Sequence, residues 1–490
     1  MKFIKNNIEI VLITLAGFVL RILAIFMDPF LHPWDERYHA LVARNIMDHP
    51  LMPTLRPSPL FGNADPFSWC CNYIWLHKQP LFMWQMALSM KIFGVSEYSM
   101  RLPSAVMGTL MIIMLHRIVM LIFKNKSVAL FSALFLTFSN FYLQLISGVR
   151  GMDHNDIAHS FYILSSIWAF AEYLRNPKWY WVMLIGVFSG GAVLNKWLTG
   201  LFVFLIWGLY LLFELIRTKK GLKRFLPFFV SVLISFTVFL PWQIYILIRY
   251  PELAIHEYKF NSRHVTEVIE GHKGSVFYYF CNLYDIVGNY IYWLILPGLF
   301  LILRKKKFND VHWALILATL FVVVFYSFLV KTKIQAYLLF IVPIFLICIA
   351  FCIEYLFKIL PKFFVLRTTI VIVIIFCLLR PIEIRDYLSE KNQDRNHHIE
   401  NTKVFKRVCK TLPENVKIVM NLSVPDDVEF MFYNPGVLGY CWSLSERDMK
   451  LLEARKIPVG FFKPHGEYGF APYVRDYPYL YVIDEQLDAY

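Results

Sequence analysis

Residues 8–27, IEIVLITLAGFVLRILAIFM, form an apolar run that is followed, after four residues, by the polar stretch 32–38, HPWDERY. A helix needs about 20 apolar residues to cross the hydrocarbon core of a bilayer. Similar runs recur to about residue 380, and only 17% of the 490 residues are charged, against about 25% in soluble domains. The sequence therefore predicts a polytopic helical membrane protein, since it lacks the alternating segments of about ten residues typical of a membrane barrel.

About eleven spans are expected, with an error of about two. Besides residues 8–27 they cover residues 101–121, 127–147, 157–174, 179–194, 198–216, 225–248, 286–303, 312–330, 334–357 and 363–380. Lysine and arginine gather in alternate loops, which the positive-inside rule assigns to the cytoplasm. The N-terminus is then cytoplasmic and the C-terminus extracytoplasmic. The net charge of +14 follows from this topology rather than from nucleic-acid binding, and the first run is expected to be an uncleaved span rather than a signal peptide.

Two parts of the chain are expected outside these spans. In the first outer loop, residues 28–97, Arg37–Met47 has a helical apolar stripe, and Pro80–Phe93 is apolar but too short to cross. Both are expected to lie along the interface, although the second could be the lower part of a tilted span. After a transmembrane domain of residues 1–380, residues 381–490 are expected to form a small α/β domain. Its strand-like runs are Lys417–Asn421, Ile457–Phe462 and Tyr479–Ile483, and its helix-like runs are Asp426–Phe432 and Glu446–Arg455.

The eight cysteines do not form a disulfide framework. On an oxidising face, Cys70 or Cys71 could bond to Cys281, or Cys409 could bond to Cys441.

Polar residues with catalytic potential fall in the predicted outer loops. A partly buried Asp35 or Glu36 could act as a general base, or each could be a solvated loop acid. Lys78, before the short apolar piece, could hold a phosphate or extend to the interface as a snorkelling lysine.

The other outer loops carry a second set of charges. Asp153 and Asp156 are three residues apart, so they would share one face of a helix or cap the following span. Lys196 interrupts an apolar stretch, where a lysine needs a partner or a polar cavity unless it snorkels. Lys331 and Lys333 follow a span and could bind an anion or anchor that span.

A divalent metal could be held by His77 together with His256 or His264, although these residues lack the helical HxxxH spacing of strong zinc sites. No phosphate-binding glycine loop for a nucleotide is present. Acids that activate a hydroxyl, and cations that stabilise a phosphate, fit the transfer of a group from a lipid phosphate to an acceptor outside the cytoplasm.

Several motifs carry a family resemblance. Residues 35–45, DERYHALVARN, are followed by HKQPL at 77–81, FGVSE at 93–97 and RLPSA at 101–105. In this order they resemble the GT-C-fold superfamily of protein mannosyltransferases that use dolichyl-phosphate-mannose and of aminoarabinose (lipid A) transferases. The resemblance continues through Arg150–Asp153, Leu240–Trp242 and Lys331–Lys333 with Tyr337, and so covers about residues 1–380.

The resemblance implies an inverting transfer of a sugar from a polyprenyl-phosphate carrier. Asp35 would be the catalytic acid–base residue, Glu36 would position the acceptor or the sugar, and Asp153 would be the second acid. The carrier phosphate and donor would be bound by Lys78, Arg101, Lys331, Lys333 and Tyr337, and the acceptor loop would include Tyr38, Arg44, Arg150 and Asp156.

The sequence departs from the family at three positions. His77 replaces a metal-binding glutamate of the aminoarabinose transferases, Gln79 replaces a proline, and Trp197 replaces the glycine after the lysine. The acceptor therefore stays open among lipid A, another envelope glycan, a lipid and a protein, with a transfer to lipid A in a bacterial inner membrane as the leading hypothesis. A transporter or flippase is the alternative, but it would place charges at mid-bilayer in broken helices, and only Lys196 fits that pattern. A non-catalytic scaffold is a third reading.

Overall fold

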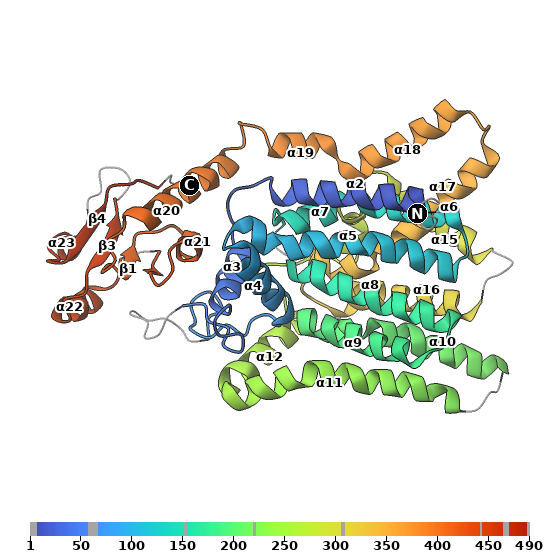
Figure 1. Ribbon diagram of the computed structural model, residues 1–490, viewed down its shortest axis with the longest axis horizontal. Helices are drawn as coiled ribbons and strands as arrows, with labels where there is room; N and C mark the ends of the chain where they lie inside the picture. Colours follow the sequence, from blue (N-terminus) through green and yellow to red (C-terminus); the bar gives the residue numbers. More distant parts are fainter. Residues whose placement is uncertain are drawn as a thin grey trace. The chain divides into compact units, whose positions relative to one another are not determined.

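The computed structural model describes residues 7–56, 67–150, 154–218, 222–304, 309–441, 443–463 and 470–487. Helices predominate, and the chain divides into two compact units (Figure 1). The first, here called the helical unit, comprises Met1–Ala24, Ser104–Ser147 and His154–Pro381. The second, the mixed unit, comprises Ile25–Pro103, Gly148–Asp153 and Ile382–Tyr490. The predicted first outer loop thus belongs to the same unit as the C-terminal segment.

The helical unit contains most of the apolar runs. Its helices, two of which extend into the mixed unit, are α2 (Ile8–Ile25), α5 (Glu97–Ile122), α6 (Lys126–Thr137), α7 (Asn140–Ser147), α8 (His154–Arg175), α9 (Trp179–Lys196), α10 (Phe202–Thr218), α11 (Leu226–Arg249), α12 (Pro251–Thr266), α13 (Tyr278–Cys281), α14 (Leu283–Ile286), α15 (Ile295–Leu303), α16 (Asp310–Val324), α17 (Val342–Ile359) and α18 (Phe364–Leu379). Short turns of helix lie at η1 (Trp197–Leu201), η2 (Leu222–Phe225), η3 (Ile291–Leu294), η4 (Phe325–Leu329) and η5 (Gln335–Ile341).

Within the described residues, seven helical segments are long and apolar enough to cross a membrane, or eight if the bent pair α6 and α7 counts as one span. The sequence predicted about eleven. The two numbers differ for three reasons. Helices α9 and α10 form one segment, Trp179–Thr218, and α15 belongs to a shorter apolar segment. Helix α8 is not among the helices that are long and apolar enough to cross. The chain is an integral membrane protein, and its number of spans stays a prediction.

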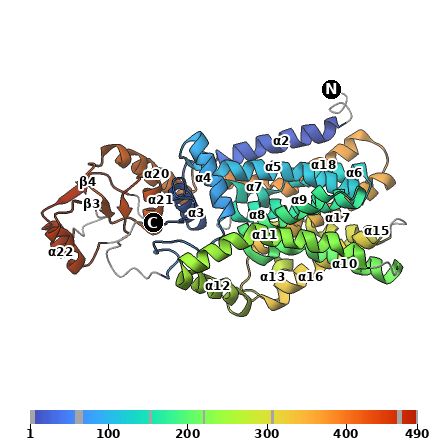
Figure 2. The ribbon, with the colours of Figure 1, turned by 60° about the horizontal axis from the view of Figure 1, so that its bottom comes forward.

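Helix α9 packs beside α8 and α11 (Figure 1, Figure 2). Gly186 and Gly190 are four residues apart, so they lie on one face of α9. A Cβ added at these glycines would lie 2.6 Å from the Ser231 carbonyl oxygen and 2.7 Å from the Ser235 carbonyl oxygen of α11, respectively. Small residues with this spacing let membrane helices approach closely.

We expect Gly190→Ala to destabilise the protein by about 1–3 kcal/mol, because the new methyl group forces the backbones of α9 and α11 apart. Thermal unfolding in detergent measures this effect. Gly208→Ala on α10 is the matched control, since its Cβ would find its nearest neighbour, the Phe228 ring, at 3.9 Å. Equal melting temperatures for the two variants would contradict the expectation.

The mixed unit contains the helices that precede and follow the outer loop and the whole sheet. Its helices are α3 (Asp35–Asn45), α4 (Leu81–Phe93), α19 (Pro381–Tyr387), α20 (Gln393–Thr411), α21 (Asp426–Tyr433), α22 (Glu446–Ala454) and α23 (Pro472–Arg475). The strands β1 (Ile418–Met420), β2 (Leu438–Gly439), β3 (Val459–Phe462) and β4 (Leu480–Ile483) form a parallel sheet in the order β2-β1-β3-β4. In this sheet Ile418 pairs with Val459, which in turn pairs with Leu480.

Both faces of the sheet are covered by helices, as is usual for parallel sheets. Val419 and Phe462 belong to a buried cluster with residues of α20 and α21. Ile418 and Phe461, which alternate with them along the strands, belong to a second cluster with residues of α22 and α23. The three predicted strands and two predicted helices of this segment are confirmed, whereas β2 and α20 were not predicted.

All eight cysteines lie in the described part of the chain, and all are free thiols. The predicted disulfides of Cys70 or Cys71 with Cys281, and of Cys409 with Cys441, are therefore wrong. The close sulfur pair is instead Cys70 and Cys71, whose Sγ atoms are 3.2 Å apart.

Candidate functional site

Helix α3 begins at Asp35, directly after a residue in an unusual conformation. Trp34 has φ 67° and ψ −123°, a region that only glycine adopts without strain. The Asp35 side chain is 18% exposed, and its Oδ1 lies 3.8 Å from the Lys78 Nζ. The structure thus brings the predicted base and a predicted phosphate-binding cation together at one end of α3.

Glu36 and Arg101 form a fully buried ion pair in the same unit. The Arg101 Nε lies 2.6 Å from Glu36 Oε1, and its Nη2 lies 2.9 Å from Oε2. Arg101 also donates to the carbonyl oxygens of Asp28 (2.7 Å) and Phe30 (2.5 Å), while the His32 N–H donates to Glu36 (2.6 Å). In the fold, both side chains hold the loop that leads into α3.

The other predicted residues of the mixed unit surround α3. The Trp69 ring lies between two of them: the Tyr38 ring meets it edge-on at 4.9 Å, and the His77 ring stacks on it at 5.1 Å. Arg44 donates to the Met431 carbonyl oxygen at 3.1 Å. Arg150 is half-buried in the turn after Gly148, and a Cβ on Gly148 would overlap the Glu36 carboxylate.

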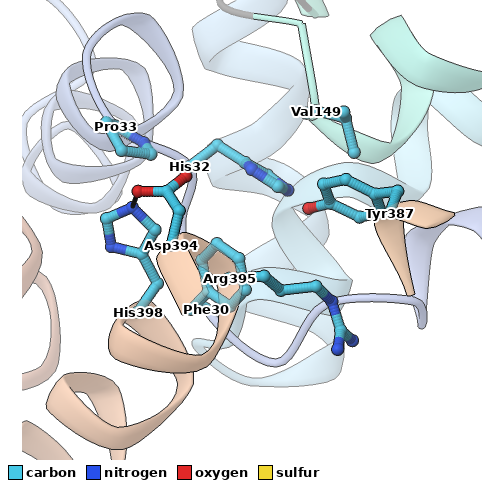
Figure 3. Close-up of a pocket in the computed structure, with 9 residues that line it drawn as sticks. Phe30, His32, Pro33, Val149, Tyr387, Asp394, Arg395 and His398 are labelled. Carbon is cyan, nitrogen blue, oxygen red and sulfur yellow. Dashed lines mark ion pairs between the residues drawn. The ribbon is translucent and has the colours of Figure 1, made fainter. Parts of the chain in front are cut away.

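A cavity of about 140 Å³ opens beside this loop. It is lined by Phe30, His32, Pro33, Gly148, Val149, Tyr387, Asp394, Arg395 and His398. Figure 3 shows His32 and Pro33 of the loop facing Asp394 and His398 of α20, with Asp394 Oδ1 3.7 Å from His398 Nε2. Pro33, in the wall of this cavity, precedes Asp35 by two residues in the sequence.

Sequence reasoning missed the acids of α21. Arg37, in the first turn of α3, contacts Asp426 and Glu429, and all three side chains are fully buried. Arg56 pairs with Asp427. The available signal was a run of three acids in the first turn of a predicted helix, where the helix dipole favours them. Nothing local identified their arginine partners.

We expect Glu429 to make the stability of the fold depend on pH. Burial, the largest effect, raises the pKa of Glu429 to about 7, while the Arg37 charge opposes it. Because the folded protein then holds this proton more tightly than the unfolded chain, the free energy of unfolding should decrease as the pH rises from about 4.5 to about 7. Thermal unfolding at a series of pH values should show this decrease in wild type and less of it in Glu429→Gln. Parallel curves for both proteins would contradict the expectation.

The helical unit holds the second set of predicted residues. Lys196, at the end of α9, contacts the buried Asp156 carboxylate in the first turn of α8. Its Nζ lies 5.1 Å from the centre of the Tyr337 ring, and the Tyr337 hydroxyl lies 3.5 Å from His264 Nδ1. Lys196 thus has the partner that a lysine at the end of an apolar helix requires. Asp153, the acid that the sequence analysis grouped with Asp156, lies outside the described residues.

Lys331 and Lys333 differ in how far their side chains are exposed to solvent. Lys331 is exposed. Lys333 is buried, and its Nζ donates to the carbonyl oxygens of Tyr326 (2.5 Å), Ser327 (2.8 Å) and Val330 (2.6 Å). Burial lowers the pKa of Lys333. All three of its N–H donors bond to carbonyl oxygens of η4 or of the residue that follows it. In the fold, Lys333 therefore anchors the end of η4.

The predicted metal site is not supported by the geometry. Of the three candidate ligands, His77 stacks on Trp69, and His256 and His264 lie on α12. Among the residues that the structure describes, no three His, Cys, Asp or Glu side chains are grouped so that they could hold a metal ion.

Comparison with known proteins places this geometry in context. Residues 77–245 match the family described as dolichyl-phosphate-mannose-protein mannosyltransferase. An uncharacterised protein of Aquifex aeolicus (strain VF5) is 25% identical over 267 residues, which are 54% of this chain and 50% of that protein. This chain therefore spans about half the length of that curated relative.

Solved structures resemble the chain over more of its length. ArnT from Cupriavidus metallidurans, bound to undecaprenyl phosphate, is 17% identical with a TM-score of 0.62, covering 92% of this chain and 89% of that one. The archaeal oligosaccharyltransferase AglB from Archaeoglobus fulgidus, in complex with an inhibitory peptide and a dolichol-phosphate, is 13% identical with a TM-score of 0.58, covering 89% and 64%. Another structure of the A. fulgidus enzyme is a complex with zinc and sulfate. These likenesses show a shared fold.

Proposed function

Because this integral membrane protein has the GT-C fold of membrane glycosyltransferases, we propose that it transfers a sugar from a polyprenyl-phosphate carrier to an acceptor hydroxyl or phosphate, with inversion at the anomeric carbon. The observation that carries the proposal is the pair of Asp35 and Lys78, 3.8 Å apart at the start of α3. We therefore propose Asp35 as the base for the acceptor and Lys78 as a cation that contacts the carrier phosphate.

Asp35 is proposed as the catalytic base. Its carboxylate takes the proton of the acceptor hydroxyl as the oxygen attacks the anomeric carbon, and the bond from that carbon to the phosphate breaks on the opposite face. Its partial exposure leaves room for an acceptor to reach it. Asp153 keeps the proposed role of a second acid that orients the sugar or the first outer loop.

The negative charge that develops on the carrier phosphate needs fixed cations. We propose Lys78 as a phosphate contact of the mixed unit. Lys196, Lys331 and the Tyr337 ring are proposed as donor-binding groups of the helical unit. Lys196 was not among the phosphate ligands first expected. It replaces Lys333, whose N–H groups are occupied by three carbonyl oxygens. Glu36 and Arg101 are assigned to holding the loop before Asp35.

Partners and location follow from the same reasoning. The ArnT structure contains undecaprenyl phosphate, which supports a polyprenyl phosphate as carrier. We propose an acceptor on the outer face of a bacterial inner membrane, with lipid A ahead of other glycans, lipids and proteins. No step is assigned to a metal ion.

The proposal is tested by incubating the full chain in nanodiscs with a panel of labelled polyprenyl-phosphate sugars and membrane extracts. Release of polyprenyl phosphate together with labelled product supports the transferase and names the donor. Transport of the intact carrier into liposomes without cleavage would instead support the flippase alternative.

We expect Lys196→Met to raise the KM for the donor by about 10- to 100-fold, because one charge-assisted contact to the phosphate is lost. The same assay with varied donor concentration measures it. Lys178→Met, at the exposed opposite end of α9, is the control and should behave as wild type. An unchanged KM in Lys196→Met would remove Lys196 from the donor site.

A further inference from the structure

Arg37 joins the first turn of α3 to the C-terminal part of the chain. It follows Asp35 by two residues and is fully buried. Its Nη1 lies 2.5 Å from Asp426 Oδ1, and its Nη2 lies 2.7 Å from Glu429 Oε2. A buried arginine is stable only with such partners. The charge beside Asp35 is thus neutralised by helix α21.

The same acids hold the loop that enters α3. Arg37 Nε donates to the Leu31 carbonyl oxygen (3.0 Å), and the Leu31 N–H donates to Glu429 Oε1 (2.9 Å). Thr402 of α20 donates to the same Glu429 oxygen (2.7 Å), and Asn401 donates to Asp426 Oδ2 (3.2 Å). Loop, α3, α20 and α21 therefore share one buried polar network.

His398 of α20 extends this network to the cavity. Burial and the Arg37 charge lower the pKa of His398 to about 3, so the ring is neutral at physiological pH. Its Nδ1 lies 3.2 Å from Arg37 Nη2 and can accept a hydrogen bond from it. His398, which lines the cavity, is consequently linked to the first turn of α3.

Helix α21 also contacts the other end of α3. Arg44, seven residues after Arg37 and so on the same face of the helix, donates to the Met431 carbonyl oxygen, and its guanidinium lies 5.9 Å from the Phe432 ring centre. Contacts at both ends fix the direction of α3 as well as its position.

The strained entry to α3 needs this support. A tryptophan at φ 67° persists only where its surroundings over-determine the backbone. Two buried ion clusters do so: Glu36 with Arg101, and Arg37 with the acids of α21. Asp35 comes immediately before these two anchored residues.

We propose, on the basis of the proposed function, that Asp426 and Glu429 are positioning residues for the transfer reaction. They hold the first turn of α3 so that the Asp35 carboxylate is directed at the acceptor hydroxyl. The C-terminal domain is then part of the catalytic machinery without contributing a group that touches the substrate.

The test compares Asp426→Asn and Glu429→Gln with wild type in the full chain. Small displacements of a catalytic group reduce turnover by up to about 100-fold. We expect kcat to fall by about 10- to 100-fold with little change in the donor KM, and hydrogen exchange in residues 35–39 to become faster. Glu485→Gln, which breaks the surface pair with Arg407 in the same domain, should change neither quantity.

Two further variants keep the test decisive. In Arg37→Met/Glu429→Gln the loss of kcat should be smaller than the product of the two single losses, because both remove one interaction. If the single variants do not fold, Arg37→Met/Asp426→Leu/Glu429→Leu replaces the cluster with apolar groups and should fold with reduced kcat. Wild-type kcat and exchange in folded Asp426→Asn and Glu429→Gln would overturn the proposal. Faster exchange in them, with no turnover even by wild type, would overturn the proposed function instead.

The close pair Cys70 and Cys71 carries a second, independent inference. The two Sγ atoms are 3.2 Å apart, and the Ser68 hydroxyl lies 3.0 Å from Cys70 Sγ. The Cys71 hydrogen bond, then Ser68 and the Arg56 charge, lower the pKa of Cys70 to about 6 against the opposing effect of burial. Cys70 is therefore the more easily ionised of the two thiols, whereas the Cys70 hydrogen bond and burial raise the pKa of Cys71.

We infer that Cys70 and Cys71 form an oxidisable dithiol site that reacts with an external disulfide. The Cys70 thiolate attacks one sulfur of that disulfide and releases a thiolate. Cys71 then loses its proton, attacks Cys70 Sγ and releases the second thiolate. Two electrons pass to the external disulfide, and a Cys70–Cys71 bond forms. Because Trp69 stacks on His77, the residue before Lys78, this bond would alter the loop that carries the phosphate-binding lysine.

Oxidised glutathione and peptide mass mapping test this inference. The peptide with Cys70 and Cys71 should lose two hydrogens and carry no glutathione, whereas the exposed Cys409 should carry a glutathione adduct. In Cys71→Ser, Cys70 should retain the adduct. Stable adducts on wild-type Cys70, or two free thiols after Cys409 has reacted, would overturn it.

Discussion

Asp35→Asn should lower the turnover number for sugar transfer by about 10²- to 10⁴-fold, the contribution typical of a general base. Asparagine has nearly the same shape as aspartate but cannot take the acceptor proton. Single-turnover release of polyprenyl phosphate in nanodiscs measures the chemical step, and thermal unfolding establishes that the variant folds. The donor KM should change little, because Lys78 and Lys196 remain in place.

Asp48→Asn is the matched control for this variant. Asp48 is an exposed acid just after the same helix, so its loss should leave turnover unchanged. Equal turnover by wild type and Asp35→Asn would remove Asp35 as the base. A folded wild type that binds carrier lipids but cleaves no donor would favour the transporter.

Arg101→Met should destabilise the protein by about 3–5 kcal/mol, because it leaves the Glu36 carboxylate buried without its cation. Both side chains are 0% exposed, and Arg101 also donates hydrogen bonds to the carbonyl oxygens of Asp28 and Phe30. Thermal unfolding in detergent, or denaturant titration, measures the loss.

Two comparisons separate this effect from a general cost of losing arginine. Arg407→Gln breaks an exposed ion pair, and such pairs contribute little to stability. Glu36→Leu/Arg101→Met removes both charges together and should recover part of the lost stability. A melting temperature for Arg101→Met that equals that of Arg407→Gln would show that the buried pair is not needed for folding.

Local sequence patterns predicted the elements that local physics decides. An apolar run such as residues 8–27 specifies a membrane helix by its length alone. Strands β1, β3 and β4 were recognisable because short β-prone runs alternate with turns. The GT-C fold, which rests on the order of several motifs, is confirmed by structural likeness over 92% of the chain.

What each charged side chain does could not be read in the same way. Lys333 and Lys196 are both lysines beside apolar runs, yet one donates to three backbone carbonyl oxygens and the other contacts Asp156. The sequence gives the charge of a residue but not the groups that bind to that residue in the folded protein.

The sequence by itself determined the membrane-helical class, the α/β character of the C-terminal segment and the stretch that begins at Asp35. The tertiary structure alone decided that Glu36 pairs with Arg101, and Arg37 with Asp426 and Glu429. Helix and strand signals arise within a few residues, through backbone geometry and burial periodicity. An ion pair between residues far apart in the sequence exists only after folding has removed both charges from water, and it leaves no periodic trace.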